Sequence, residues 1–425
     1  MTPAIVAFVV LLLIGAPVAV VMALSGLAGG FAMGGERMLG IIADRMFSGV
    51  SGFLLIAIPY FIFTAELMNQ AGLTQKLIAF NNAMFGRVRG ALSHVNITVS
   101  VFFAGLTGAA ITDTVALGKI LIPEMKRQGY DAEYAAAVTA CSSIIGPIIP
   151  PSVVMVIYAT LLRDISVIDL FVGGIIPGLL MALALLVVSF YLSWRRGYPK
   201  QAATPFKIAI LSFLLALPAL IVPLIILGGI VSGLTTITEA SGFAAVYTLV
   251  IGLVFYRTLT WRKVWNALVI TVRFSGVVFF LLATSAVLGW FVTRSGIARD
   301  AAGLIVAFSD SAFLQLMAVC LLLILIGTVM DVLPALVVVA PVLVPAMLQL
   351  GFDPLHFAIL MIVVLNISNV TPPVGMTLMT AARIANVSYE RAILASLPFY
   401  ASFIAVIVLL AAFPALSTWL PSLLN

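Results

Sequence analysis

Apolar runs recur along the whole of this 425-residue chain, separated by short polar loops. An apolar run of about 20 residues spans the hydrocarbon core of a bilayer as an α-helix. The chain is therefore predicted to be an all-α integral membrane protein. We expect nine spanning segments, at residues 4–30, 47–69, 133–160, 168–193, 208–230, 233–256, 264–292, 356–385 and 392–418.

Two further apolar stretches, 91–125 and 312–349, are each interrupted near the middle. The first is broken at 105–108 and the second at 327–328, which leaves each half short for a span. Irregular backbone is tolerated at membrane depth only where protein or a watery cavity satisfies its polar groups. We therefore predict two re-entrant hairpins whose tips lie inside the membrane.

The basic residues lie mostly in short loops between the apolar runs, such as 194–207 and 257–263. Basic loops mark the cytoplasmic side of a membrane protein. Counting spans from these loops predicts that the first hairpin enters from the cytoplasm, the second enters from the opposite side, and the C-terminus lies outside. Amphipathic stretches at 74–89 and 295–310 are expected to lie along the membrane surface as connecting arms.

The chain contains an internal repeat. Residues 123–131 (PEMKRQGYD) resemble residues 345–353 (PAMLQLGFD), at an offset of 222 from Pro123 to Pro345. The same offset pairs Gly105 with Gly327, and it also pairs the two double prolines of the chain. With the charge pattern, this predicts two repeats of inverted topology, which are typical of secondary transporters. We expect the first repeat at 47–193, linking helices at 208–256 and the second repeat at 264–418.

Composition supports a membrane protein and excludes several functions. Hydrophobic residues make up 63% of the chain and charged residues only 8%, against about 25% charged in soluble domains. The net charge of +6 comes from loop residues and does not indicate a nucleic-acid partner. No nucleophile–base pair, phosphate-binding loop or metal-ligand cluster is found in the sequence, so we do not expect an enzyme or an ATP-driven pump.

Each repeat has a double proline within the helix that follows its hairpin, at 150–151 and 372–373. A proline lacks an N–H and clashes with the carbonyl four residues earlier. Both helices, 133–160 and 356–385, should therefore be broken, and unpaired polar groups in hydrocarbon are costly. The carbonyls freed in this way are those of Gly146, Pro147, Ser368 and Asn369.

A hard cation such as Na+ would satisfy such oxygens, so we predict two sodium sites between the hairpin tips and the breaks. The first would comprise Thr107, Ala109, Gly146, Ile149 and Pro151. The second would comprise Gly327, Thr328, Asp331, Ser368, Thr371 and Pro373. The alternative is that the prolines only kink the helices for packing.

The half-helices after the breaks would present partly positive N-termini to an anionic substrate. We name Asp113, Ser152, Gly375 and Arg383 as candidate substrate-binding residues. Arg383 would grip a carboxylate as a fork, or it would extend to the cytoplasmic surface instead. Asp113 either serves the substrate or pairs with Lys119 in a structural role.

These motifs resemble those of the large membrane subunit of tripartite ATP-independent periplasmic (TRAP) transporters, over essentially the whole chain. They include 104–118 (AGLTGAAITDTVALG), 235–240 (TTITEA), 331–345, 353–354 and 371–375 (TPPVG). The chain departs from the family pattern where Ala109 and Ala110 replace frequent serines. It also departs at Ile237, where proline is usual, and at Ser368, where glycine is common.

The resemblance implies a sodium-coupled importer of organic acid anions in a bacterial inner membrane, with an elevator-type motion. It also implies two partners, a separate small four-helix membrane subunit and a soluble periplasmic substrate-binding protein. A stand-alone sodium-coupled dicarboxylate or sodium/proton carrier of related architecture is the alternative, and a passive channel is a weaker one.

Overall fold

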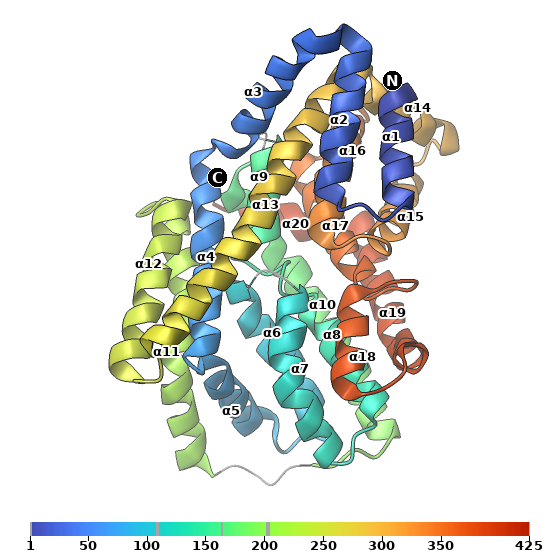
Figure 1. Ribbon diagram of the computed structural model, residues 1–425. Coiled ribbons are helices and arrows are strands. Elements are labelled where there is room, and N and C mark those ends of the chain that lie inside the picture. Colours follow the sequence, from blue (N-terminus) through green and yellow to red (C-terminus); the bar gives the residue numbers. More distant parts are fainter. Residues whose placement is uncertain (1, 108–109, 163–164, 201–204, 425) are drawn as a thin grey trace.

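The computed structural model describes residues 2–107, 110–162, 165–200 and 205–424. All regular elements in these ranges are helical, which confirms the all-α fold (Figure 1). In the described part of the chain, seven segments are long and apolar enough to cross a bilayer. They are Phe53–Gln70 (η2 and α4), Val167–Arg195 (α10), Phe206–Val231 (α11), Ile237–Phe255 (α12 and η3), Trp261–Ser295 (α13), Val332–Gln349 (α16) and Tyr389–Ala412 (α19).

The expected single span at 4–30 is wrong. The structure has two shorter helices there, α1 (Thr2–Leu13) and α2 (Val18–Gly34), which pack against each other (Figure 1). Gly15 between them has a φ of +77°, which glycine adopts readily. Pro17 then precedes α2 in an extended conformation, so a single helix cannot continue through the turn.

Both predicted hairpins are pairs of helices, but α16 is long and apolar enough to cross a bilayer, so the expectation that each half is short for a span is wrong for this helix. The first consists of α6 (Ala91–Thr107) and α7 (Ala110–Arg127), and the second of α15 (Ala312–Gly327) and α16 (Val332–Gln349). A short helix precedes each hairpin, α5 (Leu73–Phe85) in the first half and α14 (Ile297–Phe308) in the second.

The helices after the hairpins are broken beside the double prolines. The first consists of α8 (Ala132–Ser143) and α9 (Val153–Leu162), and the second of α17 (Pro354–Ser368) and α18 (Met376–Ala385). Each half is too short to cross a bilayer alone, so neither pair is among the seven candidate spans. Residues 356–368 of α17 and 134–143 of α8 are buried throughout. The first break is buried except at the half-buried Ile149, whereas the second break is partly open, since Pro373 is exposed and residues 371, 372 and 374 are half-buried.

The offset of 222 residues also relates the helices outside the hairpins. It places α2 on residues 240–256, which overlap α12 (Ile237–Val250) and η3 (Ile251–Phe255). It places α3 (Met38–Val50), η2 (Phe53–Ile56) and α4 (Ala57–Gln70) on the single long helix α13. The packing follows the same relation: α2 packs against α13, and their counterparts α12 and α4 also pack against each other (Figure 1).

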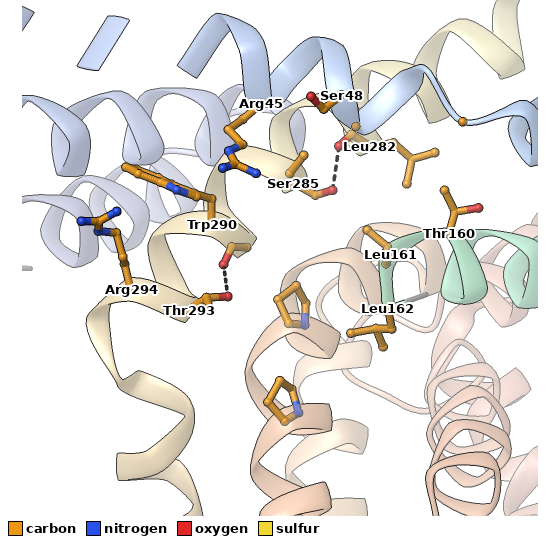
Figure 2. Close-up of a pocket in the computed structure, with 16 residues that line it drawn as sticks. Arg45, Ser48, Thr160, Leu161, Leu162, Leu282, Ser285, Trp290, Thr293 and Arg294 are labelled. Atoms are coloured by element: carbon orange, nitrogen blue, oxygen red, sulfur yellow. Dashed lines mark hydrogen bonds between the residues drawn. The ribbon is translucent and has the colours of Figure 1, made fainter. Parts of the chain in front are cut away.

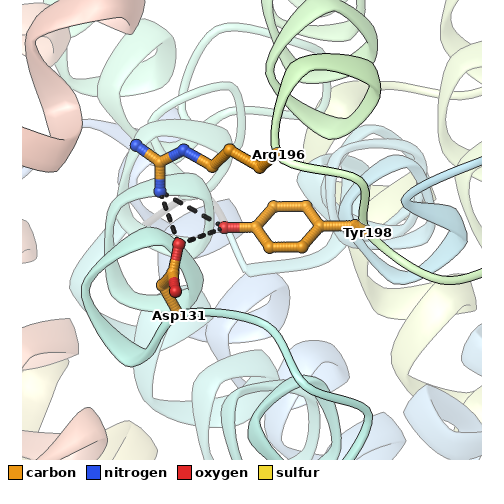
Figure 3. A network of polar contacts seen from close by, with 3 residues as sticks. All are labelled: Asp131, Arg196 and Tyr198. Carbon is orange, nitrogen blue, oxygen red and sulfur yellow. Dashed lines mark hydrogen bonds and ion pairs between the residues drawn. The ribbon is translucent and has the colours of Figure 1, made fainter.

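The end of α10 is tied to the start of α8 by three polar side chains (Figure 3). The Arg196 guanidinium lies 2.8 Å from the Asp131 carboxylate, and the Tyr198 hydroxyl donates to the same oxygen at 2.7 Å. Burial and the bond to Asp131 both raise the pKa of Tyr198, so the phenol remains a neutral donor. The last helix, α20 (Ala415–Ser422), follows α19 after a turn at Pro414.

Candidate functional site

At the second break, the hairpin tip and the broken helix touch directly. Gly327 ends α15 and Ser368 ends α17. A Cβ atom on Gly327 would overlap the side chain of Ser368. Only glycine therefore allows this close approach, and the structure brings these two members of the predicted second sodium site together.

Asp331 and Asn369 form the polar centre of the second site. The Asn369 side-chain amide donates a hydrogen bond of 3.0 Å to the Asp331 carboxylate. The amide oxygen of Asn369 is buried and has no hydrogen-bond partner among the described residues. A buried polar atom without a partner is costly, and a cation bound beside the carboxylate would satisfy it. Sequence reasoning named Asn369 only for its main-chain carbonyl and missed its side chain.

Two other predicted members of the second site, Thr328 and Thr371, have hydroxyl groups whose protons are already used in hydrogen bonds. The Thr328 hydroxyl donates to the Leu325 carbonyl at 2.8 Å, and the Thr371 hydroxyl donates to the Ile367 carbonyl at 2.9 Å. With their protons used in this way, both hydroxyl oxygens keep lone pairs for a cation. Pro373 follows Thr371 in the non-helical break.

Two of the carbonyls that the prolines were expected to leave unpaired in this half have donors. The Ser368 carbonyl accepts from the Thr371 amide at 3.0 Å, and the Asn369 carbonyl accepts from the Thr377 amide at 3.2 Å. The expectation that these two groups need a cation is therefore wrong, because the chain folds back to supply main-chain donors.

At the first break, Gly146 lies against the buried side chain of Asp113. A Cβ on Gly146 would overlap a carboxylate oxygen of Asp113. Asp113 thus reaches the break from helix α7 and lies beside the predicted first sodium site. Thr107 is the last residue of α6, and its side chain, together with Ala109, lies outside the described residues.

Ser152 closes the first break. Its hydroxyl donates to the Pro147 carbonyl and accepts from the Met155 amide at 3.3 Å. The prediction that the Pro147 carbonyl is unpaired is therefore wrong, and the Ser152 proton is already used within the chain. The remaining carbonyls proposed for the first site are those of Gly146, Ile149 and Pro151. None of these three accepts a hydrogen bond from the main chain of a described residue.

The other two substrate candidates, Gly375 and Arg383, lie near opposite ends of α18. Gly375 precedes the helix with a φ of +48°, and the Tyr389 hydroxyl donates to the neighbouring Val374 carbonyl at 2.7 Å. Arg383 lies in the last turn of α18 and is exposed. The structure does not bring Arg383 to the breaks, because the helix carries it about two turns away from Gly375.

A cavity of about 650 Å³ lies between α3 and α13 on one side and α9 and α16 on the other (Figure 2). We call it the arginine cavity, because Arg45 of α3 and Arg294 of α13 line it. Trp290 lies between the two arginines in this view, and its ring centroid is 5.8 Å from the Arg294 guanidinium. Sequence reasoning did not identify these residues, although two arginines in largely apolar segments were a visible signal.

The fold is shared with a known transporter. The crystal structure of the YdaH transporter of Alcanivorax borkumensis matches 96% of this chain and 98% of its own, with a TM-score of 0.67 and 15% sequence identity. At this identity the likeness concerns the fold alone.

Residues 5–416 match the family described as "Tripartite ATP-independent periplasmic transporter, DctM component", and the chain belongs to this family. The sialic acid TRAP transporter large permease SiaM of Vibrio cholerae is 36% identical, over 90% of this chain and 89% of that protein. The C4-dicarboxylate TRAP transporter large permease DctM of the same organism is 31% identical, over 97% and 96%.

Membership of this family identifies the chain as a transporter permease and not an enzyme. It is a multi-pass protein of the bacterial inner membrane, in agreement with its many apolar helices. Large permeases of this family work with a small membrane subunit and a periplasmic binding protein.

Proposed function

We propose that this chain is the large permease subunit of a sodium-coupled importer of an organic acid anion, which a periplasmic binding protein delivers. The observation that carries the sodium coupling is the buried Asn369 amide oxygen, which has no partner among the described residues and lies beside the Asp331 carboxylate. The names of the two relatives, which refer to sialic acid and C4-dicarboxylates, support an organic acid as substrate.

Each proposed sodium site joins a hairpin tip to a helix break. A sodium ion at the second site would bind the oxygens of Asp331 and Asn369, with the hydroxyls of Thr328 and Thr371 close by in sequence. The ion would hold the tip of α15 and α16 against α17, which already meet at Gly327 and Ser368. A ligand shifts a conformational equilibrium only towards the state that it binds better. Sodium would therefore favour the closed tip over the open one, and coupling requires this dependence.

In our proposal the hairpins and broken helices move together as an elevator relative to α4 and α13. Moving one elementary charge through 100 mV is worth about 2.3 kcal/mol. Two sodium ions with a monoanion carry one net charge inward, which alone supports roughly fifty-fold accumulation of the substrate.

The test is uptake of labelled sialic acid and succinate into proteoliposomes that contain this chain and its small-subunit partner. Sodium gradient and binding protein are each supplied or withheld. The proposal predicts uptake only when both are present. Uptake with sodium but without the binding protein would instead identify a stand-alone carrier. Flux that is indifferent to sodium would overturn the coupling and favour a channel.

Within the same assay, Asn369→Ala should raise the sodium concentration needed for half-maximal uptake. The control is Asp310→Asn, which removes an exposed charge from the loop before α15, at the opposite end of that helix from the hairpin tip. Equal sodium dependence in Asn369→Ala and in the unmodified protein would remove the second site from the proposal.

A further inference from the structure

The arginine cavity carries positive charge, and no acidic side chain is among the described residues that line it. Arg45 and Arg294 are both exposed. Neither takes part in an ion pair with any of the described residues. Figure 2 shows the two guanidinium groups on either side of Trp290. Guanidinium groups bind carboxylates through two parallel hydrogen bonds, so the cavity is suited to a carboxylate anion.

The hydroxyl groups of the cavity point to a second property of this anion. The wall contains four hydroxyl side chains, and each donates its proton to a carbonyl of its own helix at 2.8 Å. Two of these bonds are drawn in Figure 2. A hydroxyl whose proton is used still accepts hydrogen bonds through its lone pairs. The wall therefore presents acceptors to a ligand that has O–H groups of its own. The four residues are Ser48, Thr160, Ser285 and Thr293, of which Ser285 is buried and the other three are accessible.

The repeat provides an internal comparison. A second cavity, of about 550 Å³, is lined by Glu66, Lys119 and Ile270 among others. The offset of 222 residues relates Ile270 to Ser48 and Lys119 to Pro341, both of which line the arginine cavity. The two cavities therefore overlap only in part under the repeat, because five other residues of the second cavity map at the same offset onto a separate apolar cavity, at Leu288, Phe291, Ile297, Val338 and Val342. One has two arginines, whereas the other has a carboxylate beside a single lysine, so only the arginine cavity favours an anion.

We infer that the arginine cavity is a receiving site for a hydroxylated carboxylate, such as a sugar acid, on its way to the helix breaks. Arg45 and Arg294 would bind the carboxylate, the accessible hydroxyl oxygens of the wall would accept from the ligand's hydroxyl groups, and the Trp290 ring would cover an apolar face of the ligand. The inference rests on the proposed function only for the direction of travel, because binding itself needs neither sodium nor the binding protein.

The experiment is a titration of the purified complex of this chain and its small subunit, in detergent, without sodium. Trp290 fluorescence reports binding, Trp290→Phe identifies its contribution to the signal, and calorimetry gives an independent affinity. The probes are gluconate and sialic acid, which have a carboxylate and hydroxyls, succinate, which has no hydroxyl, and glucose, which has no carboxylate. We expect both hydroxylated acids to bind, succinate to bind about tenfold more weakly, and glucose not to bind, since each lost set of hydrogen bonds is worth about 1.4 kcal/mol or more.

The variants test the residues. Arg45→Gln and Arg294→Gln should each weaken gluconate binding about tenfold or more, and Arg45→Lys less, since lysine keeps the charge but loses the fork. The matched control is Arg299→Gln, an exposed arginine of α14 that is not among the residues lining the cavity. Unchanged binding in both glutamine variants would overturn the site, and equal affinity for succinate and gluconate would overturn the role of the hydroxyls. Absence of uptake in the transport assay, with binding intact in the titration, would count against the proposed function alone.

Discussion

The contact between α6 and α8 is polar, whereas the equivalent contact between α15 and α17 is apolar. In the first half, the Asn96 amide donates to the Thr139 hydroxyl at 2.6 Å and accepts from the Ser142 hydroxyl at 3.2 Å. Ser100 extends the network, and all four side chains are buried. At the same offset of 222, the second half has Ala318, Leu322, Met361 and Val364.

The difference concerns how far each hairpin can shift. A buried hydrogen-bond network holds only when every member keeps its partner, so α6 is fixed against α8 in one register. Apolar attraction has no direction, so sliding of α15 along α17 strains no network between these two helices, and the bond from Asn369 to Asp331 at the hairpin tip is what opposes it. The first half is therefore expected to behave as a rigid unit and the second half as the more mobile one.

The largest effect is expected from Gly146→Ala. The new methyl group would overlap the Asp113 carboxylate and lie 3.2 Å from the Ser143 carbonyl. Overpacking costs about 1–3 kcal/mol, and if the full 3 kcal/mol raises the barrier to transport, the rate falls about a hundredfold. Sodium-driven uptake measures it. Gly276→Ala is the control, since a Cβ there has no neighbour within 4 Å. Normal uptake by Gly146→Ala would show that this approach is not required.

Asn96→Ala should have the next largest effect, on stability. It removes two buried hydrogen bonds between α6 and α8, at about 1 kcal/mol each, although Thr139 and Ser142 keep bonds to carbonyls of α8. Thermal unfolding of the purified complex in detergent measures the change. Thr98→Ala on the same helix is the control, because its hydroxyl bonds only to carbonyls of α6. If both variants unfold alike, the network does not specify the first half.

At the proposed second sodium site, Asp331→Asn should weaken sodium binding while the fold is retained. The amide keeps an oxygen for Asn369 but loses the negative charge, so we expect half-saturation at about tenfold more sodium, or about 1.4 kcal/mol. The readout is the sodium dependence of uptake. An unchanged dependence would contradict a role for Asp331 as a ligand.

The smallest effect on stability is expected at Asp131, which the offset of 222 residues pairs with Asp353. Asp353 caps α17 by accepting from the His356 amide at 2.7 Å, whereas Asp131 before α8 has no such bond and holds Arg196 and Tyr198 instead. Tyr198→Phe removes the phenol's hydrogen bond and should cost about 1 kcal/mol of stability. Thermal unfolding again measures it, with the exposed Tyr191→Phe as control. A loss above that of Asn96→Ala would mean that the loop after α10, rather than the α6–α8 network, does more to hold the first half together.

Local chemistry made the hairpin ends and the helix breaks predictable. Gly327 and the double prolines at 150–151 and 372–373 act on the backbone within a few residues, so their effect can be inferred from sequence alone. The turn at Gly15 gave a comparable signal beside Pro17 and was hidden by the apolar residues around it.

Side-chain partnerships were not predictable. Arg45 and Arg294 meet in one cavity because α3 packs against α13, and no local pattern encodes that contact. The pairing of Asn369 with Asp331 likewise depends on how α16 meets α17. The sequence identifies where the chain must break, and tertiary packing decides which groups face each break.

Helix α13 has 35 residues, which at 1.5 Å per residue makes it about 52 Å long. The hydrocarbon core of a bilayer is about 30 Å thick, so a helix of this length must tilt or extend beyond it. The same helix supplies Trp290 to the arginine cavity and Ile270 to the second cavity. Lipid acyl-chain length, by changing this tilt, would alter how deep both cavities lie.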